Sequence, residues 1–158
     1  MKHSSRIGSV LGAALGIALL ARSVAMPAFA ALGEDAASIE NDRVQMKGQS
    51  RLTSVAGYSV QEIQLPSGTI VREYVSPGGK VFAVSWRGPV IPDLQQTLGT
   101  YFEQYKAAAA GAPHGGHHHL TVRQPGLVAH SSGHMRAWVG QAYVPGLLPP
   151  NFSVDDIQ

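Results

Sequence analysis

The stretch GYSVQEIQLPSGTIVREYVSPGGKVFAVSWRG, residues 57–88, decides the fold of this chain. It holds three runs rich in β-branched and aromatic residues, which favour β-strands: 60–65, 69–75 and 80–87. The sequences LPSG (65–68) and SPGG (76–79) separate them. In each, proline presets one turn angle and glycine accepts a positive φ. Connections this short join antiparallel strands, so the stretch predicts a three-stranded meander.

The third run is the most apolar part of the meander. Phe82, Val84 and Trp86 alternate onto one face, and Val81 and Ala83 lie on the other. A strand that is apolar on both faces is central or covered on both sides. We therefore expect this strand in the middle of the fold, with Trp86 in the core.

Three of the charged residues of the meander lie on its first two strands. Arg72 and Glu73 could act as polar handles in a site, but we interpret them as a solvated strand face because isolated charges are weak evidence of function. Glu62 and Glu73 could form a carboxylate pair on neighbouring strands. The turn between the strands favours positions out of register, or ion pairs with Arg72 or Lys80.

Residues 1–30 have the three parts of an export signal. Lys2 and Arg6 supply the positive start, residues 7–21 are apolar, and Ala28-Phe29-Ala30 is a small-residue cleavage site before Ala31. The apolar run is too short for a stable membrane span. We predict cleavage between Ala30 and Ala31 and a periplasmic or secreted protein with no stable span after cleavage. An uncleaved membrane anchor is the alternative.

Charge and cysteine content bound the function of the remaining chain, residues 31–158. The signal holds three of the 12 Lys and Arg residues and none of the 10 Asp and Glu, so its removal leaves nine basic and ten acidic side chains. This balance gives no basic footprint for nucleic acid. The length fits one domain. The absence of cysteine excludes disulfides, thiol catalysis and cysteine-based metal sites.

Two helices are expected outside the meander. Residues 34–47, with Asp35 as a cap, predict a short peripheral helix, and residues 49–56 link it to the meander or start the first strand early. Residues 93–110 predict the main helix. Its apolar stripe, which packs on the sheet or alternatively lines a ligand groove, comprises Leu94, Leu98, Tyr101, Phe102 and Tyr105.

A second β unit follows a flexible His-rich loop at 111–119. We expect strands at 120–123, 127–130 and 134–144, with turns at 124–126 and at Ser131-Ser132-Gly133. The predicted fold class is a single α+β domain, an antiparallel meander of about five or six strands packed against one main amphipathic helix.

Two stretches of the chain resemble a known family in combination. LPSGTIVREYVSPGGKVFAVSWRGPVIPDL (65–94) and HSSGHMRAWVGQAYVPGLLPPNFSVDDI (130–157) occur in an order that is similar to small exported bacterial proteins catalogued as domain of unknown function 2844. The resemblance covers residues 31–157 and implies export and one small domain. It implies no catalytic residues, and the His-rich insert at 114–119 departs from the family pattern.

The histidines are candidate metal ligands, because neutral imidazole binds Zn, Cu and Ni. His130 and His134 flank the expected turn, and His117, His118 and His119 could add nitrogens from the loop. The chain lacks HExxH spacing. The alternative is a solvated low-complexity loop that binds metal only weakly. A serine hydrolase using Ser131 or Ser132 with His134 is disfavoured, because SSGH lacks the G-x-S-x-G elbow.

The function that these observations favour is a non-enzymatic binding or accessory module. Its partner would be an unidentified protein or small ligand in the cell envelope, with Trp86, Arg87 and Arg136 as candidate ligand-binding residues. The sequence assigns no catalytic residue and no cofactor, and P-loop, dinucleotide and EF-hand motifs are absent. The alternatives are a metal-binding or metal-delivery protein and a small enzyme of unrecognised type.

Overall fold

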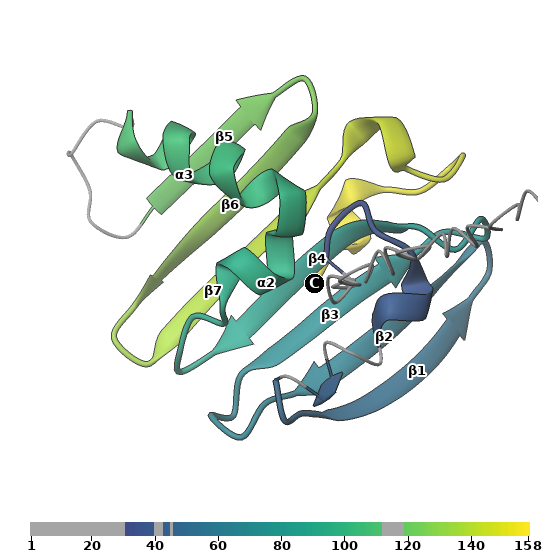
Figure 1. Ribbon diagram of the computed structural model, residues 1–158, viewed down its shortest axis with the longest axis horizontal. Coiled ribbons are helices and arrows are strands. Elements are labelled where there is room, and N and C mark those ends of the chain that lie inside the picture. Colours follow the sequence, from purple (N-terminus) through teal and green to yellow (C-terminus); the bar gives the residue numbers. More distant parts are fainter. Residues whose placement is uncertain (1–30, 40–42, 45, 112–118) are drawn as a thin grey trace, which may run out of the picture.

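A computed structural model describes residues 31–39, 43–44, 46–111 and 119–158 (Figure 1). These residues form one antiparallel sheet of seven strands in the order β1-β2-β3-β4-β7-β6-β5. The class predicted from sequence is confirmed, with more strands than expected. The strands are β1 (Gln49–Val55), β2 (Tyr58–Gln64), β3 (Ile70–Val75), β4 (Val81–Gly88), β5 (His119–Gln124), β6 (Leu127–His134) and β7 (Ala137–Tyr143).

Strand β4 is the centre of the sheet, as its apolar sequence predicted. Its first six residues are all buried, and it pairs with β3 on one side and β7 on the other. We call the face that carries Ile63, Val71 and Trp86 the inner face and the opposite one, with Tyr58 and Tyr74, the outer face. Each face has its own cluster of buried side chains.

Phe82 does not share a face with Val84 and Trp86, which corrects the simple alternation expected from sequence. Tyr74 pairs with Ala83 but Val75 pairs with Val81, so Phe82 is the extra residue of a β-bulge. The bulge turns Phe82 to the outer face, where it packs with Tyr74. One strand thereby supplies large apolar side chains to both clusters.

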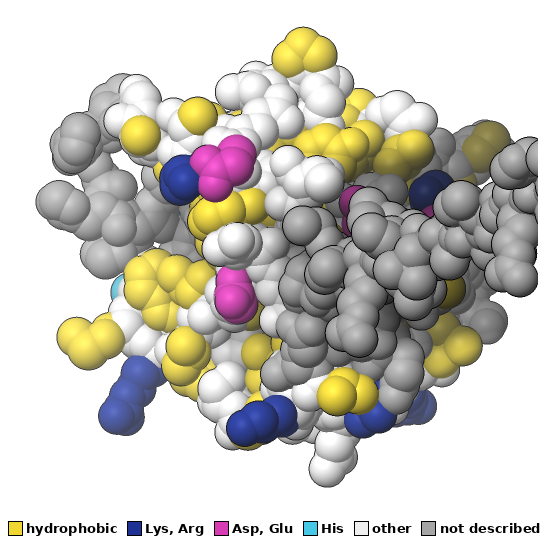
Figure 2. Space-filling model, viewed as in Figure 1, with side chains coloured by type: hydrophobic (Ala, Val, Ile, Leu, Met, Phe, Trp, Pro, Cys, Tyr) yellow, Lys and Arg dark blue, Asp and Glu magenta, His cyan; other side chains and the backbone are white. Residues whose placement is uncertain are grey.

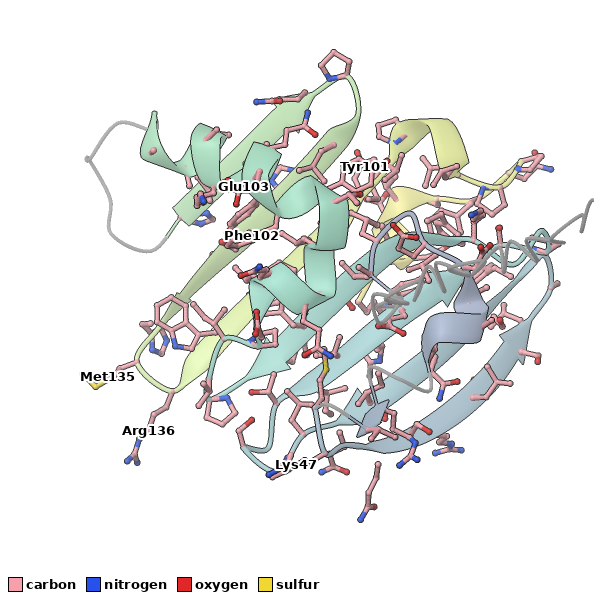
Figure 3. The ribbon with its side chains drawn as sticks, in the orientation of Figure 1. Lys47, Tyr101, Phe102, Glu103, Met135 and Arg136 are labelled. Atoms are coloured by element: carbon pink, nitrogen blue, oxygen red, sulfur yellow. The ribbon has the colours of Figure 1, made fainter. Side chains whose placement is uncertain are left out.

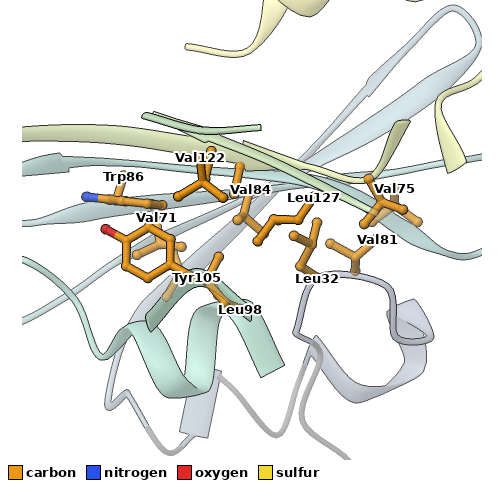
Figure 4. Close-up of a cluster of buried hydrophobic side chains, with 14 of the residues drawn as sticks. Leu32, Val71, Val75, Val81, Val84, Trp86, Leu98, Tyr105, Val122 and Leu127 are labelled. Atoms are coloured by element: carbon orange, nitrogen blue, oxygen red, sulfur yellow. The ribbon is translucent and has the colours of Figure 1, made fainter. Parts of the chain in front are cut away.

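The inner face is covered by the predicted main helix, which runs through α2 (Leu94–Leu98), the 3₁₀ turn η2 (Gly99–Tyr101) and α3 (Phe102–Ala110). Asp93 caps it by accepting hydrogen bonds from the backbone N–H groups of Gln95 and Gln96. Leu98 and Tyr105 are buried against the sheet (Figure 4). The other members of the predicted stripe are half-buried against the same cluster, so the stripe packs on the sheet.

The N-terminal segment lies beside the helix over the inner face. Ala31 and Leu32 are buried, and the N–H of Gly33 donates to the carbonyl of Val81 at 2.8 Å. The helix predicted at 34–47 begins as a 3₁₀ turn, η1 (Ala36–Ser38), and part of it lies outside the described residues. Residues 49–56, expected mainly as a linker, instead contain the complete strand β1.

The second hairpin of the later β unit turns at Met135 and Arg136, and the turn predicted at 131–133 is wrong. Ser131, Ser132 and Gly133 continue β6, while Arg136 takes a φ of 68° at the tip. Gly133 pairs with Trp138, and a Cβ at this position would clash with the backbone of β7. The glycine thus permits close strand packing and does not form the turn.

The C-terminal segment covers part of the outer face. It contains two 3₁₀ turns, η3 (Pro145–Leu147) and η4 (Val154–Asp156), and buries Ile157. Phe152 meets the rings of Phe82 at 4.7 Å and Tyr58 at 5.0 Å between centroids, both edge to face. Among the described helices, none has the length and apolar character needed to cross a membrane.

Candidate functional site

The outer face carries a cross-strand row of polar residues, which the C-terminal segment covers in part at Ser85. Residues directly opposite in an antiparallel pair place their Cβ atoms about 4.5–5.5 Å apart. Strand by strand from β1 to β5, the row consists of Arg51, Glu62, Arg72, Ser85, Gln141, His130 and Thr121. On the helix-covered side the Lys and Arg side chains are scattered, and one of them lies beside an acidic side chain (Figure 2).

Arg72 is held in this row by two side-chain hydrogen bonds. Its Nε donates to Oε2 of Glu62 at 2.9 Å, and its Nη1 donates to the main-chain carbonyl oxygen of Gln158 at 2.9 Å. The hydroxyls of Ser85 and Tyr74 donate to the same carbonyl at 2.6 and 3.1 Å. Three side chains from β3 and β4 therefore hold Gln158 against the sheet.

A cleft of about 230 Å³ opens between this anchored residue and strand β1. Its lining includes two arginine and two carboxylate side chains, whose formal charges cancel, together with hydroxyl and amide groups. The lining residues are Arg51, Thr53, Tyr58, Val60, Glu62, Arg72, Tyr74, Asp156 and Gln158.

Tyr58 forms the aromatic wall of the cleft. Its ring packs against Phe152, Tyr74 and Phe82. Burial raises the pKa of the Tyr58 hydroxyl above its usual value of 10.0, and the charges of Asp156 and Tyr74 add to the rise. The phenol is therefore neutral at physiological pH, where it can both donate and accept a hydrogen bond.

A second, smaller cavity lies at the other end of the polar row. Its volume is about 120 Å³, and its lining residues are His119, His130, Ser131, Ser132, Val139, Gly140 and Gln141. His130 pairs with Thr121 and its Nδ1 lies 3.2 Å from the Thr121 hydroxyl. His119 pairs with Ser132, so the two histidines are diagonal neighbours on one face.

The histidine arrangement expected from sequence is corrected by the position of the turn. His130 and His134 do not flank a hairpin turn: both lie on β6, four residues apart, and His134 is exposed at the strand end opposite Ala137. His117 and His118 lie outside the described residues. Within the described residues, no group of three or more metal-ligating side chains comes together.

The other residues predicted to bind a ligand lie apart from one another. Trp86 is 2 % exposed and faces the core. Arg87 is exposed on the outer face outside the cleft, and Arg136 projects from the hairpin tip together with Met135 (Figure 3). Of the two serines considered for a hydrolase, Ser131 faces the helix-covered side, where its hydroxyl lies 3.3 Å from that of Tyr105.

Sequence reasoning missed the cleft and one buried charge. Glu62 and Arg72 are almost equally distant from the LPSG turn, so their pairing, and with it part of the charged row, could have been predicted from the sequence. Glu73 was interpreted as part of a solvated face, yet its side chain is fully buried on the inner face beside Val71 and Val75. Glu62 and Glu73 therefore lie on opposite faces and form no carboxylate pair.

Comparison with known proteins agrees with the resemblance seen in the sequence. Residues 28–157 match the model of the family described as "Protein of unknown function (DUF2844)". No curated protein and no solved structure matches the chain. Because the matched region spans most of the sequence, the chain belongs to the DUF2844 family of proteins of unknown function.

Proposed function

We propose that this protein is an exported, non-enzymatic binding module that takes a small, neutral polyhydroxylated ligand in the cleft over β1, β2 and β3. The observation that carries the proposal is the composition of the cleft, in which Arg51, Glu62 and Arg72 alternate across three strands and Tyr58 and Asp156 complete the lining. Export rests on the signal features of residues 1–30, and a ligand in the cell envelope would meet the protein there.

Alternating charges favour a ligand whose groups both donate and accept hydrogen bonds. A hydroxyl can accept a hydrogen bond from an arginine and donate one to a carboxylate. Neighbouring hydroxyls of a sugar can therefore bind both the arginines and the carboxylates of the cleft. A net anion would face Glu62 and Asp156, and a net cation would face Arg51 and Arg72. The Glu62 carboxylate is already held by Arg72, which fits a positioning role better than proton transfer.

The size of the cleft limits how much ligand it can cover. Pockets for drug-sized molecules usually measure about 300–1,000 Å³, so a cleft of about 230 Å³ suits one sugar ring or one unit of a longer chain. The Tyr58 ring supplies an apolar wall beside the polar groups, and aromatic rings commonly pair an apolar face with a polar end in this way.

Calorimetric titration with glucose, N-acetylglucosamine and glucuronate tests the proposal. We expect the neutral sugars to bind and glucuronate to bind less well. Arg51→Ala removes an exposed cleft residue and should weaken binding about tenfold, the loss of one charged hydrogen bond. Arg87→Ala is the matched control, since Arg87 lies on the same face outside the cleft. Binding of glucuronate alone, or equal losses in both variants, would contradict the proposal.

Metal binding is a second candidate function, favoured by the diagonal positions of His119 and His130 beside the smaller cavity. The two imidazoles come from neighbouring strands and could hold Zn, Cu or Ni with water completing the shell. Titration with Zn²⁺ and Cu²⁺ should show His130→Ala to lose most of the affinity, while His134→Ala, on the same strand, changes little. Binding should weaken as the pH is lowered, because a protonated imidazole cannot ligate a metal. Equal affinity in wild type and His130→Ala would exclude this site.

A further inference from the structure

Strand β1 is an exposed edge of the sheet. All seven of its residues are exposed, and on the side away from β2 it pairs with no strand in the described part of the chain. Its apolar side chains Leu52 and Val55 are 63 % and 44 % exposed. Edge strands are usually protected by prolines, bulges or several charges, yet β1 has no proline and a single charge, Arg51. These features are those of a strand that pairs with another strand.

We propose that β1 pairs antiparallel with β1 of a second copy of this chain, about a two-fold axis at Leu52. The sequence QSRLTSV permits this register, because Leu52 then meets Leu52 and each Ser50 meets Ser54 of the other copy. This register also avoids placing the two Arg51 side chains opposite each other. Arg51 lies opposite Thr53, a hydroxyl that accepts a hydrogen bond, so no like charges face each other directly.

A second copy is the occupant that closes the assembly. Pairing β1 with the other edge, β5, would leave free edges at both ends and produce open chains of molecules. Pairing β1 with β1 uses the same surface on both copies and stops at two. The exposed Leu52 side chains cover each other at the axis, which removes the most exposed apolar residue of the strand from water.

The pairing would also extend the binding surface. Arg51 and Thr53 lie on the outer face of β1 and line the cleft. In the dimer, Thr53 of the second copy stands beside Arg51, so the polar row continues into the second cleft without an intervening edge. Two clefts joined in this way fit a chain-like ligand with repeated units. This extension rests on the proposed function, whereas the strand pairing does not.

The oligomeric state of the exported protein, measured by light scattering after gel filtration, tests the pairing. We expect a mass twice that of the monomer. Leu52→Lys and Leu52→Glu should each give monomers, because like charges would face each other across the axis. Mixing the two variants should restore a dimer. Val90→Lys is the matched control, since Val90 is 52 % exposed but lies outside β1, and it should stay dimeric.

The cysteine-free sequence allows a second, geometric test. Leu52→Cys should form a disulfide-linked dimer on mild oxidation, because residues directly opposite bring their Cβ atoms close to disulfide distance. Val90→Cys should not. A wild-type monomer at every soluble concentration, or open polymers, would overturn the proposal. A monomer that binds sugar leaves the proposed function standing, and a dimer that binds none leaves only the pairing.

Discussion

Glu62 and Arg72 lie directly opposite each other on β2 and β3, with Nε of Arg72 2.9 Å from Oε2 of Glu62. The pair fixes the orientation of the guanidinium, so that Nη1 of Arg72 reaches the main-chain carbonyl of Gln158. A single arginine therefore links the β2–β3 hairpin, the cleft and the C-terminal segment.

Removal of either partner of this pair should have unequal effects on stability. Their side chains are 34 % and 31 % exposed, so Glu62→Gln should lower the free energy of unfolding by about 0–1 kcal/mol. Arg72→Ala also removes the hydrogen bond to Gln158 and should cost about 1–3 kcal/mol more. Urea unfolding measures both, with Arg87→Ala as the control. Equal losses in the two variants would show that the contact with Gln158 contributes nothing.

Substitution of either Trp86 or Gly140, which pack against each other, should lower the stability of the fold. Trp86→Ala empties a fully buried site and should cost about 3–5 kcal/mol. In Gly140→Ala, the new methyl group would clash with the indole, so we expect a loss of about 1–3 kcal/mol. Gly146→Ala is the control, because its methyl group would meet no atom nearby in the described structure. A neutral Gly140→Ala would mean that the indole can move aside.

Tyr58 should make the protein sensitive to alkaline pH. Its pKa in the folded state is raised above the ordinary value of 10.0, so the folded protein holds a proton that the unfolded chain releases first. The stabilisation is complete below pH 10 and is lost as pH rises through the folded pKa. Urea unfolding between pH 8 and about pH 11 should show a steeper decline in wild type than in Tyr58→Phe. Parallel declines would argue against the raised pKa.

Export should be visible in the mass of the protein. We expect cleavage between Ala30 and Ala31, because residues 1–30 carry all three parts of a signal. Intact-mass measurement of protein from the periplasm or medium checks the site. A protein that retains residues 1–30 in the membrane fraction would instead be anchored.

The sequence predicted the elements whose side chains are strongly patterned. The apolar run of β4 placed it centrally, and the stripe from Leu94 to Tyr105 gave the helix that covers the sheet. Strand β1 was not predicted in full, because all its residues are exposed and its sequence therefore shows no alternation of buried and exposed positions. The bulge at Phe82 was not predicted, because the alternation argument assumes that each residue of a strand pairs with one residue of its partner.

The errors at the candidate site have a different origin. They arose because residues were interpreted by their type alone, without the pairing of the strands on which they lie. Ser131-Ser132-Gly133 has turn chemistry, but Gly133 serves close approach to Trp138, and the turn falls at Arg136. Glu73 shares the strand period of Val71 and Val75, which placed it on the buried face despite its charge. The cleft depends on segments far apart in sequence, β1 and the residues around Asp156, which no local pattern connects.

The burial of Ala31 and Leu32 would set an order of events if residues 1–30 are removed as we predict. Both residues lie in the folded core, with Ala31 against Gly99 of the helix and Leu32 hydrogen-bonded to Thr97. A signal peptidase needs the chain on both sides of its cut to be extended and accessible. The predicted cleavage after Ala30 would therefore have to precede the closing of the helix over the sheet, and a precursor that folds too early would escape processing. Folding speed and export would then compete in time, and a slower-folding variant would be processed more completely.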